Sequence, residues 1–170
     1  MTTMTHNQEE IMSGATTVTT LSEREVAIER VFNAPRERVF VAYTDPQLIP
    51  QWWGPRRMTT IVDQMDVRPG GAWRFISHDC EGQEQSFRGI YREVTSPERL
   101  VQTFEWEGMP GHVAVETVTF EDLGERTRMR TTSLFHTTEE RDGMLSSGME
   151  SGVTESHERL EELLAAKEIM

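Results

Sequence analysis

The feature that most constrains the fold is a run of six short segments between residues 59 and 135 in which apolar and polar residues alternate. The segments read "TTIVDQMDV", "AWRFISHD", "QSFRGIYREV", "RLVQTFEW", "HVAVETVTF" and "RTRMRTTSLF". Alternation with period two is typical of β-strands, because successive side chains of a strand point to opposite faces. Short turns rich in Gly, Pro and Asp separate the segments, and such turns join neighbouring antiparallel strands. The sequence therefore predicts a meander of antiparallel hairpins.

The residues before this run predict one further strand and two short helices. "EREVAIERVF" alternates in the same way and gives the first of seven expected strands. "NAPRERVFVAYT" follows, and Pro35 suits the first turn of a helix because its missing N–H would have no partner there. Asp45-Pro46 predicts the start of a second short helix, which Gly54-Pro55 ends.

The C-terminal part changes character and predicts one long amphipathic helix. Its apolar positions recur at spacings of three and four. Thr138 with Arg141 forms an imperfect capping box at its start, and Gly143, Gly148 and Gly152 either thin the helix near the sheet or let it bend. The residues on this stripe are Leu145, Met149, Val153, Ser156, Leu160 and Leu164 or Leu163. Together these elements predict an α+β fold in which a curved antiparallel sheet wraps around the helix.

Length and composition indicate one soluble domain. The chain has 170 residues, which suits a single domain (residues 17–170) after a polar, Thr-rich tail (residues 1–16) that we expect to be flexible. No apolar run is long enough for a membrane span, and the N-terminus does not read as a secretory signal. The single cysteine, Cys80, excludes an internal disulfide and fits a cytoplasmic protein. A net charge of −12 argues against nucleic acid as a partner.

The sequence carries none of the common catalytic or metal-binding motifs. It contains no GxSxG, HExxH or P-loop, and its five histidines do not stand at metal-ligand spacing. His78 beside Asp79 is a weak acid–base candidate, because neighbouring residues of a strand point to opposite faces. We therefore expect no metal, no cofactor and no catalytic residue.

Four motifs in order resemble one family. They are "VFNAPRERVFVAYTDPQLIPQWWGP", "VRPGGAWRF", "FRGIYREVTSPERLVQTFEW" and "GMESGVTESHERLEELLA". This pattern resembles the bacterial homologues of the activator of heat-shock-protein-90 ATPase, within the START-like (SRPBCC) superfamily and its helix-grip fold. The resemblance covers roughly residues 20–167. It implies a cavity between the concave face of the sheet and the long helix, suited to an apolar or amphipathic small molecule such as a lipid.

Candidate ligand-binding residues come from the strand faces that carry aromatic side chains and from the helix. An aromatic inner face is also expected of an ordinary core, so each of these residues either contacts a ligand or packs in the core. Gly89 allows either close packing or open space, and the buried polar residues Gln102 and Ser77 need partners, from the protein or from a ligand. Of Trp52 and Trp53, one is expected in the core and the other at the rim, because adjacent helical residues face different directions. The candidates are Trp53, Trp73, Phe75, Gly89, Tyr91, Gln102, Phe104, Trp106, Met149 and Val153.

Three function classes fit these features. The leading one is non-enzymatic binding of a hydrophobic or amphipathic small molecule. The second is a cyclase-like or hydrolase-like enzyme, which predicts an inward carboxylate or histidine facing Arg74 or Gln102. The third, which the family name implies, is a partner that stimulates a chaperone ATPase in a stress response. A homodimer is compatible with the sequence, which does not test it.

Overall fold

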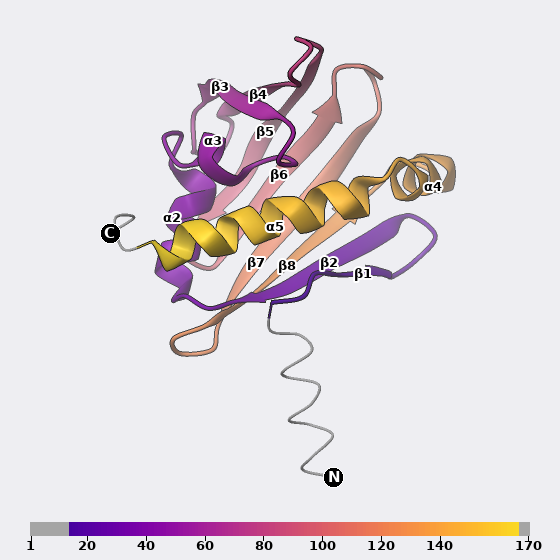
Figure 1. Ribbon diagram of the computed structural model, residues 1–170. Coiled ribbons are helices and arrows are strands. Elements are labelled where there is room, and N and C mark those ends of the chain that lie inside the picture. The colour runs from indigo at the N-terminus through magenta and orange to yellow at the C-terminus, as the bar shows by residue number, and fades with distance from the viewer. Residues whose placement is uncertain (1–13, 167–170) are drawn as a thin grey trace.

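A computed structural model describes residues 14–166 and shows one eight-stranded antiparallel sheet crossed by a long helix (Figure 1). The strand order is β1-β2-β8-β7-β6-β5-β4-β3, so every neighbour from β3 to β8 is also a neighbour in sequence. The strands are β1 (Thr17–Thr20), β2 (Glu25–Phe32), β3 (Thr59–Met65), β4 (Ala72–His78), β5 (Glu84–Thr95), β6 (Arg99–Trp106), β7 (Val113–Asp122) and β8 (Thr127–Leu134). This arrangement confirms the predicted meander and the α+β class.

The expected count of seven strands was wrong by one. β1 is a four-residue edge strand whose residues pair with Val26–Glu29 of β2. Its sequence, "TVTT", is too short for alternation to distinguish it from the polar residues before it. Tertiary pairing with β2 therefore defines this strand, and residues 1–13 of the predicted tail lie outside the described part of the chain.

Two short helices follow β2 and lie at one end of the sheet (Figure 1). Helix α2 spans Arg36–Thr44, directly after Pro35, and buries Val39, Phe40 and Ala42. Helix α3 spans only Ile49–Trp52. The Asp45 carboxylate accepts a hydrogen bond from the Gln47 amide at 2.9 Å, so Asp45 holds a turn that precedes α3 and does not cap the helix itself.

The predicted single C-terminal helix is in fact two helices. Helix α4 spans Thr138–Ser146 and helix α5 spans Met149–Ala165. Gly148 separates them with a φ of 84°, in the left-handed region that glycine adopts without a Cβ clash. The cap of α4 is Thr137, whose side chain accepts from the Glu140 amide at 3.1 Å, so the expected Thr138–Arg141 box was wrong by one residue.

Helix α5 lies across the concave face of the sheet, and hydrogen bonds hold its C-terminal half (Figure 1). The Arg38 guanidinium of α2 donates to the Leu164 carbonyl at 2.6 Å, where the last carbonyls of a helix lack intrahelical partners. The Arg159 guanidinium donates to the Gly54 carbonyl at 2.9 Å, and the Gly54 amide donates to Ser156 Oγ at 2.8 Å. This half of α5 is thereby fixed to α2 and to the turn after α3.

The buried apolar residues form two clusters. The major cluster lies under the C-terminal half of α5 and gathers large side chains from α2, α3 and most strands, including Phe32, Phe120, Leu100, Trp52 and Leu160. The minor cluster comprises buried Val26, Ile28, Ala114 and Phe135, against which half-buried Val18, Met144, Leu145, Met149 and Val153 pack. The two clusters do not merge, and the residues that separate them form the candidate site.

Candidate functional site

Three polar side chains lie in register across the middle of the concave face. Gln102 of β6 is paired with Glu116 of β7, and Glu116 is paired with Ser133 of β8. Gln102 Nε2 donates to Glu116 Oε1 at 3.3 Å, and Ser133 Oγ donates to Glu116 Oε2 at 3.5 Å. We call Gln102, Glu116 and Ser133 the polar row.

The polar row faces inward because of strand alternation. On β7 the inward positions are Ala114, Glu116, Val118 and Phe120, and the three apolar members are all buried. Glu116 and Gln102 are instead half-buried, although they lie at central positions of the same face. The inner surface therefore keeps some accessibility at the row, while Leu100 and Val118 beside it are enclosed.

Burial controls the ionisation of Glu116. Desolvation raises the pKa of the Glu116 carboxyl to about 7, and the hydrogen bonds from Gln102 and Ser133 oppose this rise. Among the described residues no lysine, arginine or histidine forms an ion pair with Glu116. The carboxyl group is thus held by neutral donors alone and changes its charge near neutral pH.

Aromatic side chains lie around the polar row. Tyr91 of β5 is paired with Gln102, and Phe104 is the next inward residue of β6, paired with Ala114 beside Glu116. Tyr43 of α2 packs edge-on against Phe120 with ring centroids 5.5 Å apart. Burial, and secondarily the charge of Glu116, raise the pKa of the Tyr43 phenol, which stays protonated. The Glu116 carboxyl group therefore lies among aromatic side chains.

Five of the candidates named from the sequence belong to the major cluster. Trp73, Phe75 and Tyr91 are buried within it, and Trp53 and Phe104 pack against it half-buried. Trp53 packs edge-on against Phe75 and Phe87, each with centroids 5.2 Å apart. Trp52 is 2% exposed and its indole N–H donates to the Ala42 carbonyl, which confirms that one of the two tryptophans belongs to the core. A ligand-facing role for Trp53 stays a prediction.

The other candidates are distributed over different places. Met149 and Val153 pack against the minor cluster. Trp106 is 37% exposed and lies over Gly108 in the turn after β6, away from the polar row. A Cβ built on Gly89 would come within 1.9 Å of the Thr103 carbonyl oxygen and 2.4 Å of the Trp73 ring, so Gly89 permits close packing and does not open space.

The remaining polar candidates have partners within the protein. Ser77 is buried and shares a hydrogen bond of 2.9 Å with Thr60, whose hydroxyl also donates to the Trp53 carbonyl. Arg74 lies on the opposite face of the sheet from Trp73 and pairs with Glu107 and Asp63. Both therefore serve the sheet itself.

Glu116 is not among the site residues predicted from the sequence, although the sequence contains a signal for it. "HVAVETVTF" places a glutamate in phase with Ala114, Val118 and Phe120, and a charged residue at an apolar position of a strand marks a functional candidate. His157 was not predicted either; it is 4% exposed and its Nδ1 lies 2.8 Å from Thr16 Oγ1. Burial, and then the charge of Arg30, lower the pKa of His157 to about 3, so this imidazole is neutral and serves packing against Phe32.

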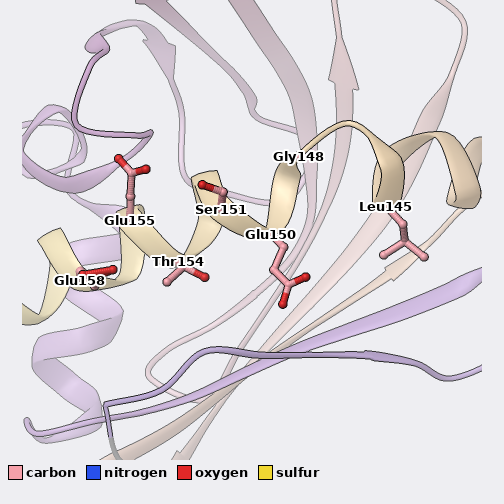
Figure 2. A pocket seen from close by; sticks show the side chains of 7 residues that line it. All are labelled: Leu145, Gly148, Glu150, Ser151, Thr154, Glu155 and Glu158. Atoms are coloured by element: carbon pink, nitrogen blue, oxygen red, sulfur yellow. The ribbon is translucent and has the colours of Figure 1, made fainter.

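A separate open hollow of about 590 Å³ runs along the outer side of α4 and α5 (Figure 2). Ser151, Glu155 and Glu158 of its lining lie on the side of α5 opposite to Val153 and Leu160. Leu145, at the α4 end of the hollow, also packs against the minor cluster. This hollow is not between the sheet and the helix, so the predicted ligand cavity there stays a prediction. In residues 14–166 no group of His, Cys, Asp and Glu has the arrangement of a metal site, and no helix is long and apolar enough to cross a membrane.

The curved antiparallel sheet and the long helix across it define a START-like domain of the helix-grip type. Residues 33–165 match the model of the family described as "Activator of Hsp90 ATPase homolog 1-like protein", and the chain belongs to this family. The resemblance noted in the sequence is thereby confirmed.

Solved structures agree on the fold. A Rhodobacter sphaeroides protein is similar with a TM-score of 0.83 at 23% identity, covering 88% of this chain and 97% of that one. An Arthrobacter aurescens protein has a TM-score of 0.81 at 25% identity, covering 88% and 91%. DynU16, described as a putative protein in the dynemicin biosynthetic locus, has a TM-score of 0.64 at 20% identity, covering 83% of this chain and 47% of DynU16. No curated protein matches the chain.

Proposed function

We propose that this chain binds a hydrophobic or amphipathic small molecule on the concave face of its sheet, beneath α5. The observation that carries the proposal is the polar row, in which half-buried Glu116 and Gln102 lie among apolar and aromatic side chains at the centre of the concave face. Burying a carboxyl group without a charged partner costs free energy that a plain core would avoid by using an apolar residue. A few polar groups among aromatic walls are typical of small-molecule sites.

A pair of variants on one strand tests the site. Gln102→Phe adds an aromatic ring at the polar row, whereas Val101→Phe adds the same ring on the opposite face of β6. Thermal-shift and native mass spectrometry measurements with a panel of lipids and aromatic compounds identify a ligand for the wild-type chain. We expect Gln102→Phe to abolish the shift and Val101→Phe to retain it. If both variants bind as the wild type does, the ligand lies elsewhere and the proposal fails.

One observation supports a second candidate, an enzyme that uses the same face. Such an enzyme requires an inward carboxylate facing Arg74 or Gln102, and Glu116 faces Gln102. A carboxyl group whose pKa lies near 7 can both accept and donate a proton at neutral pH. Turnover of a bound compound by the wild type, lost in Glu116→Gln with binding retained, supports an enzyme. Binding without turnover in both supports a carrier.

The chaperone alternative rests on the family description. A partner surface would need exposed apolar residues, and Trp106, Met109 and Val113 are exposed around the turn between β6 and β7. Measurement of the ATPase rate of the chaperone with and without this chain tests that role. An unchanged rate removes the alternative and leaves the ligand site unaffected.

A further inference from the structure

The charge balance around Glu116 specifies the ligand class more narrowly than the fold does. The two atoms that hold the carboxylate, Gln102 Nε2 and Ser133 Oγ, belong to neutral groups at 3.3 and 3.5 Å. Both distances are at the long end of hydrogen-bond geometry, so neither donor strongly compensates a full negative charge. Among the described residues the Glu116 carboxylate therefore has two weak neutral donors and no cation.

Glutamates on the outer face of the sheet differ from Glu116 because they pair with arginines. On the outer face of the sheet, Glu107 receives two hydrogen bonds from Arg74, at 2.7 and 3.0 Å, and Glu105 receives one from Arg88 at 3.1 Å. These arginines lower the pKa of both carboxyl groups. The sheet thus supplies cations to its outer glutamates, while the inward glutamate has none among the described residues.

Aromatic side chains near Glu116 are a second feature that favours a cation. Tyr43, Tyr91 and Phe104 approach the polar row from α2, β5 and β6. The negative face of an aromatic ring attracts an organic cation, and a carboxylate among such rings combines both attractions. The net charge of −12 raises the local concentration of cations and lowers that of anions.

We propose that the ligand of the concave face is an amphipathic amine, with its protonated nitrogen paired to Glu116 and its apolar body lying on the side toward α4, against half-buried Phe104, Met149 and Val153. This inference rests on the proposed function and narrows it. The amine supplies the positive charge that the described residues do not place beside Glu116. The row amide Gln102 and the hydroxyl of Ser133 then orient the carboxylate toward the ligand.

Three probes with one skeleton test the inference: 2-naphthylmethylamine, 2-naphthylmethanol and 2-naphthoic acid. Isothermal titration with the full chain at neutral pH should show the amine binding about tenfold or more tightly than the alcohol, and the acid most weakly. Glu116→Gln should lose this preference, leaving the amine and the alcohol about equal. Glu121→Gln is the matched control, because Glu121 is an exposed residue of the same strand and pairs with Arg128.

The outcomes separate the two proposals. If the wild type binds the alcohol or the acid as tightly as the amine, the amine inference is overturned and the binding function stands. The same holds if Glu116→Gln keeps the preference for the amine. If no probe and no member of the broader panel binds, the proposed function fails as well.

A titration of the wild type alone gives a second test that needs no variant. Ionisation of Glu116 should raise the affinity for the amine between about pH 5.5 and about pH 8, while the affinity for the alcohol stays flat. The groups that face Glu116 are neutral Gln102 and Ser133 from β6 and β8 and protonated Tyr43 from α2. Helix α5 contributes apolar Met149 and Val153 to the adjoining minor cluster. A flat amine affinity over this range contradicts the pairing.

Discussion

The two apolar clusters differ in how α5 closes them. In the major cluster the helix inserts Leu160 and Leu164, which are buried, and hydrogen bonds from Arg38 and Arg159 hold the helix in place. In the minor cluster the helical side chains, such as Met149, are only half-buried, and α4 buries no residue at all. One half of the interior is therefore built as a core, and the other half is covered loosely. The polar row lies at the boundary between them.

This difference between the two clusters indicates which part of the interior stabilises the fold and which part leaves room for a ligand. Large enclosed side chains supply most of the free energy of folding, and a site that admits a ligand must keep surface that the chain itself does not fill. The arrangement assigns the first task to the end with α2 and α3. The binding that we propose would occupy the polar row and the side toward α4.

The largest expected effect tests the closure of the two clusters directly. Leu160→Ala removes a fully enclosed side chain from the major cluster and should lower the free energy of unfolding by about 2–5 kcal/mol. Met149→Ala removes a half-buried side chain from the minor cluster and should cost about 1 kcal/mol. Urea denaturation of both variants measures the difference. Equal losses of stability in the two variants would show that α5 encloses both clusters equally well.

A second comparison uses two glycines. Gly89→Ala places a Cβ against the Thr103 carbonyl and the Trp73 ring in the major cluster, and should destabilise the protein by about 1–3 kcal/mol. Gly152→Ala meets nothing within 4 Å on α5 and should stabilise it by up to about 1 kcal/mol through helix propensity. Thermal or urea unfolding checks the two signs. A loss of stability in Gly152→Ala would mean that the half of α5 over the minor cluster has no room for a methyl group at this position.

The third prediction concerns pH and the boundary between the clusters. The folded-state pKa of Glu116 is raised to about 7 from 4.5, so its ionisation opposes folding, and stability falls as the pH rises from about 4.5 through about 7. Relative to the wild type, Glu116→Gln should gain on the order of 1–2 kcal/mol between pH 4 and pH 8, after allowance for partial exposure. Urea titrations at both pH values measure the gain.

His157 provides the control for that titration because its shift has the opposite sign. Its pKa is lowered from 6.5 to about 3, because the folded protein holds the imidazole in its neutral form. The stability that depends on the neutral imidazole is therefore fully present above pH 6.5 and is lost as the pH falls toward 3. Glu116→Gln should leave this acid-side loss unchanged. A variant whose stability relative to the wild type is independent of pH would show that Glu116 is well solvated.

The smallest effect is local. Thr137→Ala removes the cap of α4 and should cost about 1 kcal/mol, mostly as fraying of α4. Amide hydrogen exchange should become faster in residues 138–146 and stay unchanged in the half of α5 that contacts the major cluster. Faster exchange throughout α5 would show that Gly148 does not separate the two helices mechanically.

Much of the fold could be predicted from local patterns, because hairpins and alternation are properties of consecutive residues. β3 to β8 follow directly from them, whereas β1 depends on pairing with β2 and has no local signal of its own. The break at Gly148 was noticed only as a glycine within a helical stripe. Its positive φ depends on how α4 is placed against the sheet, which the spacing of apolar residues does not encode.

The site was less accessible to prediction. Most aromatic residues expected on the inner face lie in or against the major cluster, but Trp106 is exposed. The pairing of Tyr91 with Gln102 depends on a register shift between Tyr91 and Glu93, which strand alternation does not predict. Glu116 required the assignment of inner and outer faces on β7, and its lack of a cationic neighbour required the positions of residues distant in sequence. Gly89 could not be interpreted from the sequence, because a glycine fits both a close contact and an empty space.

The bonds between α5 and the turn after α3 have a mechanical consequence. Gly54, Ser156 and Arg159 form a brace in which each element both donates and accepts, and the Arg56 amide adds a further bond to Glu155. These bonds fix α5 from its middle onward, whereas its first residues follow Gly148 and pack only against half-buried side chains. An outward movement of α5 would therefore pivot at these bonds and begin at its N-terminal end.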